Sequence, residues 1–275
     1  MRRALLAILL CAPLFAASSY PQEIAQWRSQ REAALKAPDG WLTVSGLFWL
    51  REGDNRFGRD EANQIVLPDG PARTGVFHLH SGKVTVDIEG ATRPLQPDSD
   101  VAADMVKVGR LTLTVIKRGD RFGIRMRDPD SKMRRDFHGI ASYPTNEQYR
   151  VTARFVPSPS KIAITNLLGQ TTPEDSPGYV VFRLNGKELR LYPVVDDPAS
   201  KSLFFVFRDL TTGKTTYGAG RFLEAEAPHN GQVTLDFNEA YNPPCAFTPY
   251  ATCPLPPKEN RLPVAIEAGE KKYGH

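Results

Sequence analysis

The sequence predicts a mainly β fold, in which antiparallel sheets form a sandwich or a barrel-like arrangement, with one N-terminal amphipathic helix and an irregular, proline-rich C-terminal coil. Apolar and polar residues alternate over about a dozen short segments, as they do along half-buried strands. The 275 residues include 23 prolines and 21 glycines, which suits short strands joined by turns. No long helical segment separates the predicted strands, so a doubly wound parallel sheet is not expected.

The amphipathic helix is predicted over residues 21–37, because apolar residues recur there near helical spacing. Pro38-Asp39-Gly40 then ends the helix. From residue 41 the apolar period changes to two, which predicts a first strand over residues 41–50. The apolar helix residues are Ile24, Trp27, Ala34 and Leu35.

The clearest hairpin joins residues 180–184 to 189–191 through Asn185-Gly186, a dipeptide that favours the two-residue turn between antiparallel strands. A second hairpin joins residues 77–80 to 84–88 through Ser81-Gly82. The other predicted strands are residues 111–115, 122–126, 151–155, 203–207, 215–223 and 232–238.

The N-terminus predicts export. Met1-Arg2-Arg3 is followed by an apolar run of 14 residues, 4–17, and by small residues at which a signal peptidase can cut. This pattern is typical of a secretory signal peptide, here residues 1–19. A membrane anchor needs about 20 apolar residues, so we expect a periplasmic or secreted protein with no stable membrane span after cleavage.

The charge balance argues against a nucleic-acid partner. Cleavage removes Arg2 and Arg3, which leaves 33 basic residues against 31 acidic ones and lowers the formal net charge from +4 to +2. Hydrophobic residues make up 41% of the chain, which excludes a disordered protein. Residues 20–275 are predicted to form a single β-rich domain. The stretch 128–147 is rich in Asp, Arg, Lys and Pro, and is either a seam between two β units or one long surface loop.

No standard catalytic signature is present: the sequence has neither a G-x-S-x-G elbow nor an H-E-x-x-H zinc motif. His78 and His80 share one strand face, which suits two metal ligands, but surface alternation explains them equally well. We therefore predict no metal and no cofactor.

Cleavage also removes Cys11 and leaves Cys245 and Cys253. Two cysteines close in sequence, in an oxidising compartment, predict a disulfide. A zinc site and a catalytic thiol are the alternatives. The zinc site lacks further ligands nearby, and the thiol lacks a base.

The polar residues around the C-terminal coil are the best candidates for a site, because a carboxylate pair and an arginine can perform acid–base chemistry or hold a polar ligand. The structural alternative is that these side chains satisfy backbone groups in an irregular coil. The catalytic candidates are Asp236, Glu267, Glu270, Arg221 and Tyr217, and the ligand-binding candidates are Asn238, Tyr241, Asn242 and Asn260.

The same stretch resembles the signature of a bacterial family, domain of unknown function 1684. The resemblance covers roughly residues 22–273, and it implies one coherent unit but no reaction. The segments that carry it are 41–50, 216–223, 235–238, 240–247, 253–257, 260–262 and 268–271.

Two functions from different classes follow. The first is a cell-envelope protein that binds a small molecule or a glycan, which the absence of catalytic motifs favours. The second is a hydrolase using Asp236, Glu267 or Glu270, with Arg221 or Tyr217 stabilising charge. The hydrolase requires at least two carboxyl groups to converge in one cleft, one of them with a raised pKa.

Overall fold

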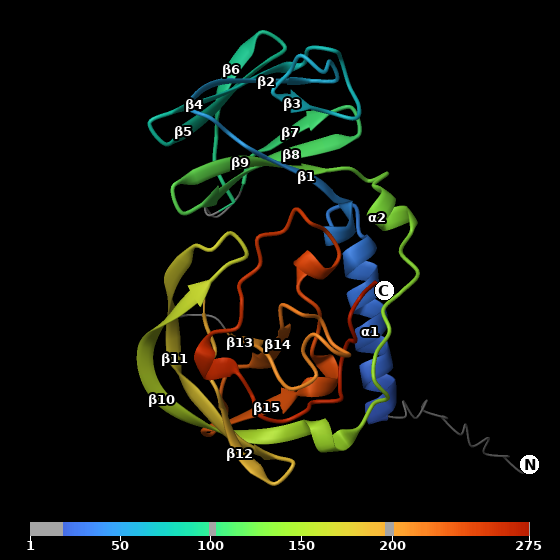
Figure 1. Cartoon of the computed structure of the whole chain (residues 1–275), viewed down its shortest axis with the longest axis vertical. Coiled ribbons are helices and arrows are strands. Elements are labelled where there is room, and N and C mark those ends of the chain that lie inside the picture. Colours follow the sequence, from blue (N-terminus) through green and yellow to red (C-terminus); the bar gives the residue numbers. More distant parts are fainter. Residues whose placement is uncertain (1–18, 99–102, 196–200, 275) are drawn as a thin grey trace, which may run out of the picture.

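The computed structural model describes residues 19–98, 103–195 and 201–274. The predicted signal peptide, residues 1–19, therefore lies outside the described residues except for Ser19. The described chain is mainly β, with several antiparallel sheets and one long helix at its start, as predicted (Figure 1). The helices are α1 Tyr20–Lys36 and α2 Lys132–Arg135, and the 3₁₀ turns are η1 Trp41–Thr43, η2 Glu147–Tyr149, η3 Phe237–Glu239, η4 Pro244–Ala246 and η5 Lys258–Asn260.

The described residues form fifteen strands. The first nine are β1 Val44–Trp49, β2 Gly53–Gly58, β3 Ile65–Val66, β4 Gly75–His80, β5 Lys83–Ile88, β6 Ala91–Leu95, β7 Met105–Val108, β8 Leu111–Arg118 and β9 Arg121–Arg127. The last six are β10 Arg150–Thr165, β11 Thr171–Leu184, β12 Lys187–Leu191, β13 Ser202–Phe207, β14 Arg221–Glu226 and β15 Gln232–Asp236.

Strands β1 to β9 form the upper unit in Figure 1. Two sheets, with the orders β1-β9-β8-β7 and β3-β2-β4-β5-β6, enclose one apolar core, so this unit is a sandwich. Phe57 and Phe77 stack at its centre with ring centroids 4.3 Å apart. On β4 the alternation is as predicted: Phe77 and Leu79 are buried, whereas His78 and His80 face outward.

Strands β10 to β15 form the lower unit. The sheet β12-β11-β10-β15 curves around a second core, and the β13-β14 ribbon lies inside it (Figure 1). Phe237 is fully buried and packs against Phe182 and Phe207 at centroid distances of 5.7 and 5.6 Å. No sheet of the described strands closes into a barrel.

The chain crosses between the units twice. Helix α1 runs along the lower unit, β1 enters the upper one, and the segment containing α2 returns to β10 (Figure 1). The two cores lie on either side of residues 128–147 in the sequence. The domain boundaries themselves stay a prediction.

Several strand predictions need correction. Residues 215–220 are not extended, and only the last three residues of the predicted strand 215–223 belong to β14. Alternation also missed β2, β3, β6 and β7, which are short or rich in Gly and polar residues. The Asn185-Gly186 hairpin is confirmed: both residues have positive φ, 51° and 76°, as its turn requires.

Helix α1 begins and ends within one residue of its predicted bounds, but only Ile24 and Leu35 are buried. Ala34 is exposed and Trp27 is half-buried, so the helix turns a narrower apolar face to the protein than the sequence predicted. Among the described helices, none is long and apolar enough to cross a membrane.

The C-terminal segment after β15 is an irregular coil with 3₁₀ turns, as predicted. Isolated backbone pairs join it to the rest of the lower unit, among them Tyr241 with Phe222 and Glu270 with Ser142. The coil thus contacts both the β14 edge, through Tyr241, and helix α1, through Glu270 and Arg31.

Candidate functional site

Arg221, a catalytic candidate, is 1% exposed and serves the core. Its guanidinium donates to Asp209 Oδ2 at 2.7 Å and to the carbonyl oxygens of Ile266 and Ala268. It also lies 5.3 Å from the Phe207 ring centroid. The side chain ties the C-terminal coil to the ribbon and is not open to a substrate.

The three asparagine candidates also bind backbone. Asn260 accepts from the Tyr192 amide and donates to the Tyr192 and Val206 carbonyls. Asn238 accepts from the Asn146 amide and donates to its carbonyl oxygen. The Asn242 side chain donates through Nδ2 to the Lys271 carbonyl at 2.7 Å, and its Oδ1 is buried without a hydrogen-bond partner among the described residues. These contacts match the structural alternative considered for this coil.

The three carboxylate candidates do not converge. Asp236 accepts from the Tyr20 hydroxyl at 2.9 Å, at the start of α1. Glu270 is buried and accepts from Arg31 Nε at 3.3 Å and from the backbone N–H of Asn242 at 2.7 Å. Eleven residues separate the two helical partners, which is about 16 Å along the axis. Glu267 is exposed.

Cys245 and Cys253 are free thiols, so the predicted disulfide is wrong for this structure. Instead, the Cys245 amide donates to Cys253 Sγ at 3.2 Å. The sulfur thus satisfies a backbone donor of the η4 turn. Tyr217 donates its hydroxyl to the Cys245 carbonyl at 2.9 Å. Burial, together with the neighbouring Cys245 thiol, raises the pKa of the phenol. Both contacts hold the coil in place.

One concave surface of the lower unit lies where α1 faces β14, β15 and η3. Two adjoining hollows, of about 520 and 270 Å³, share the side chains of Trp27, Glu224 and Glu239. We call them together the α1 groove. Its other lining residues include Gln30, Arg31 and Tyr241 at one end and Arg150, Glu226, His229 and Asp236 at the other.

Tyr241, a ligand-binding candidate, helps to form this groove. Its hydroxyl donates to Glu224 Oε1 at 2.6 Å. The Arg31 guanidinium lies 4.6 Å from its ring centroid, and the Trp27 ring lies 6.4 Å away. Burial and the Glu224 carboxylate raise the pKa of the Tyr241 phenol, so it stays a neutral donor that orients Glu224.

Glu239 differs from the other acids of the groove. Burial, together with the nearby charges of Asp236 and Glu224, raises its pKa from the ordinary 4.5 to about 7, although Arg150 opposes this shift. Among the described residues, its carboxyl group forms no hydrogen bond or ion pair. Near neutral pH this group therefore exists in both protonation states and has donor and acceptor capacity free for a ligand.

Sequence reasoning missed Glu239, Glu224 and Trp27 as site residues. The alternation of β14 places Glu224 and Glu226 on its outer face, which was readable. However, only the tertiary packing brings helix α1 beside that face. Trp27 was assigned to an apolar stripe, and the sequence has no signal that it borders a hollow.

Residues 135–271 match the model of a family described as "Protein of unknown function (DUF1684)". Among solved structures, an uncharacterized protein of Haloarcula marismortui, determined by solution NMR, is 34% identical. That alignment covers 50% of this chain and 78% of that protein, with a TM-score of 0.42. No curated protein matches the chain.

The raised pKa of Glu239 predicts a pH-dependent stability. The folded state holds this proton more tightly than the unfolded state, so the stability that the proton contributes is lost as the pH rises from about 4.5 to about 7. Glu239→Gln should therefore melt at a higher temperature than the unmodified protein at about pH 8, and at the same temperature near pH 4. Because the group is partly exposed, we expect a gain of about 1 kcal/mol, or about 2–4 °C.

The control is Glu226→Gln, an exposed side chain on the same groove, which should change the melting temperature equally at both pH values. Equal shifts for Glu239→Gln at both pH values would contradict this account of Glu239.

Proposed function

We propose that this protein, which belongs to the family of proteins of unknown function DUF1684, binds a neutral or amino-substituted oligosaccharide in the α1 groove. The family description names no reaction, so the function is inferred from the groove alone. The observation that carries this proposal is Glu239: a carboxyl group with free hydrogen-bonding capacity, at the point that both hollows share.

The size of the groove suits such a ligand. Small-molecule sites commonly enclose about 300–1,000 Å³. The larger hollow, of about 520 Å³, lies within that range, and the smaller one, of about 270 Å³, lies just below it and extends the first. The indole of Trp27 is half-buried and borders both of them. An aromatic face of this kind packs against the apolar C–H face of a sugar ring, while the carboxylates around it accept hydrogen bonds from hydroxyl groups.

The charge of the groove excludes acidic ligands from this proposal. Four carboxyl groups line the larger hollow, those of Glu224, Glu226, Asp236 and Glu239, and its basic lining residues are Arg150 and His229. Arg150 lies 3.9 Å from Asp236, which offsets part of its charge. A negative potential of this kind attracts amino groups and repels uronic acids or phosphates.

A second candidate is hydrolysis of the same ligand. Glycoside hydrolases combine a protonated carboxylic acid with an ionised carboxylate, and a raised pKa marks the acid. Glu239 has that property, and Glu224 or Asp236 is the available partner in the groove. This candidate replaces the earlier one based on Glu267 and Glu270, which do not line the groove with Asp236.

We also propose that the protein acts outside the cytoplasm, in the periplasm or the medium. The N-terminal charge, the apolar run of residues 4–17 and the small residues that follow support export. The mass of the protein recovered from the cell envelope or medium should correspond to a chain that begins close to residue 20. A recovered mass equal to that of all 275 residues would contradict export by cleavage.

Trp27→Ala should weaken binding at least tenfold, because removal of the indole opens the groove and removes its apolar face. The affinity is measured by calorimetric titration with neutral and amino-substituted oligosaccharides. Acidic oligosaccharides serve as the negative control. The matched control is Trp49→Ala, whose ring packs under Arg121 in the upper unit and should leave binding unchanged.

The two candidate functions differ in the fate of the ligand. Release of a shortened sugar by the unmodified protein, and its loss in Glu239→Gln, would identify a hydrolase. Intact ligand with retained affinity would identify a binding protein. Equal affinities of Trp27→Ala and the unmodified protein for every sugar that binds would contradict the groove as the site.

A further inference from the structure

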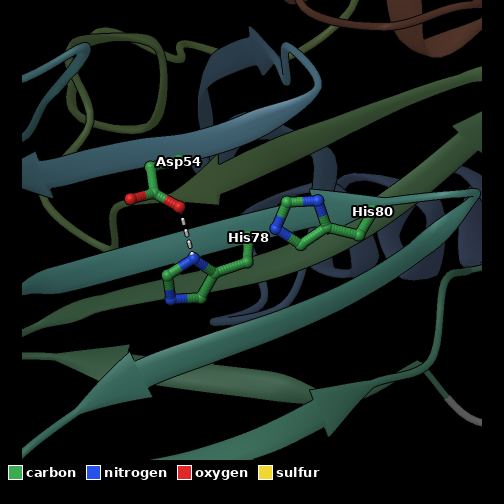
Figure 2. A group of neighbouring side chains, drawn as sticks. All are labelled: Asp54, His78 and His80. Atoms are coloured by element: carbon green, nitrogen blue, oxygen red, sulfur yellow. Dashed lines mark hydrogen bonds and ion pairs between the residues drawn. The ribbon is translucent and has the colours of Figure 1, made fainter.

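The outer face of the upper unit carries a second cluster of side chains that can bind metals, Asp54, His78 and His80 (Figure 2). Its strands β2 and β4 lie in the upper unit, whereas the α1 groove lies in the lower one (Figure 1). Asp54 on β2 lies directly opposite His78 on β4 in the antiparallel register. His80 follows two residues later on the same face of β4, and its ring is nearly parallel to that of His78, with centroids 6.4 Å apart.

One ligand atom from each of Asp54, His78 and His80 lies within 4.8 Å of the other two. His78 Nδ1 is 2.7 Å from Asp54 Oδ1. In a tetrahedral zinc site with bonds of about 2.0–2.1 Å, neighbouring ligand atoms are about 3.3 Å apart. Small side-chain rotations therefore suffice to bring these three atoms around one ion.

A fourth ligand adjoins the cluster. Glu52 Oε1 is 3.7 Å from His80 Nδ1, and the same oxygen accepts from the Ser81 amide at 3.0 Å, which holds the carboxylate beside the histidine. Two imidazoles from β4, one carboxylate from β2 and one from Glu52, directly before β2, make a ligand set that zinc and similar ions use in proteins.

The contact between His78 and Asp87 is the observation that most strongly supports a metal site. Asp87 on β5 lies 3.0 Å from His78 Nε2, so this ring nitrogen is occupied by a carboxylate and the other one, Nδ1, points toward Asp54. Thr92 in turn donates to the second oxygen of Asp87. Metal-binding histidines almost always have such a partner on the nitrogen that does not bind the metal, because it sets the tautomer and the ring orientation.

We propose that Asp54, His78 and His80, with Glu52 as the fourth ligand, bind a divalent transition-metal ion of the zinc type, and that Asp87 orients His78 for this purpose. In the sequence, surface alternation explained the two histidines as well as metal binding did, and no metal was predicted. The structure adds the carboxylates of β2 and β5, which lie at separate places in the sequence.

The site is open to solvent. The side chains of Asp54 and His80 are more than half exposed, and that of His78 is 20% exposed. An ion here reaches its ligands without any movement of the backbone. It would also join β2 to β4 on their outer face, whereas the core joins them on the inner one.

The test is Zn²⁺ binding to the purified, untagged and chelator-treated protein, measured by equilibrium dialysis with elemental analysis. We expect one Zn²⁺ per chain. His78→Ala together with His80→Ala should abolish it. Asp87→Asn keeps every ligand, and should weaken the affinity about 10–100-fold, as loss of an outer-shell partner does.

Two controls separate this site from other zinc-binding groups. His138→Ala removes a histidine elsewhere, and Cys245→Ser with Cys253→Ser removes the two thiols; both should leave the stoichiometry and affinity unchanged. The proposal is overturned if the unmodified protein binds no Zn²⁺ at micromolar concentrations, or if the double histidine variant binds it as well as the unmodified protein. Because His80 is exposed, His80→Ala alone serves if the double variant does not fold.

Discussion

The ion pair between Arg31 and Glu270 is the interaction on which the lower unit depends. It joins the first helix to the C-terminal coil, and the two residues are 239 positions apart in the sequence. Glu270 is 2% exposed, and burial raises the pKa of its carboxyl group despite the nearby guanidinium. A buried charge of this kind is tolerated only with a well-placed partner, and removal of one partner typically costs about 3–5 kcal/mol.

Arg31 does more than neutralise Glu270. Its Nη2 donates to the Asn242 carbonyl at 2.9 Å, and its guanidinium lies over the ring of Tyr241. One side chain thus fastens the coil to α1 and sets the Tyr241 ring that borders the α1 groove. Other polar residues of α1 also attach the helix to neighbouring segments: Arg28 donates to the Tyr143 carbonyl, and Glu32 accepts from the Ile140 backbone amide. Polar contacts therefore hold much of this helix to the protein, since only Ile24 and Leu35 are buried.

Whether an element was predictable from the sequence depends on the kind of contact that holds it in the fold. Alternation reveals a strand when one face is buried and the other is wet, as on β4, where Phe77 and His78 take opposite faces. It fails on β2, whose Gly53, Asp54 and Arg56 leave too few apolar residues to show a period. The helix was predictable, but its partners were not, because ion pairs and hydrogen bonds leave no periodic trace in a sequence.

The same reasoning applies to the sites. The candidates Arg221, Asn238 and Asn260 were selected as polar residues in a distinctive motif, and the structure shows that each binds backbone or a buried partner. The groove residues Trp27 and Glu239 come from segments more than 200 residues apart. The histidine pair was visible in the sequence, but its carboxylates became neighbours only through the strand register. Local motifs thus identified the residues that hold the coil, whereas tertiary packing creates the candidate sites.

The central claim is that Arg31 holds α1 in place and so forms the groove. Hydrogen exchange of the α1 amides in Arg31→Met tests it most directly, because methionine keeps an apolar stem of similar length but removes the charge. The account predicts that α1 loses protection while β4 and β5 of the upper unit keep theirs, and that Gln26→Met, an exposed position on the same helix, changes nothing. Unchanged protection of α1 in Arg31→Met would contradict the account.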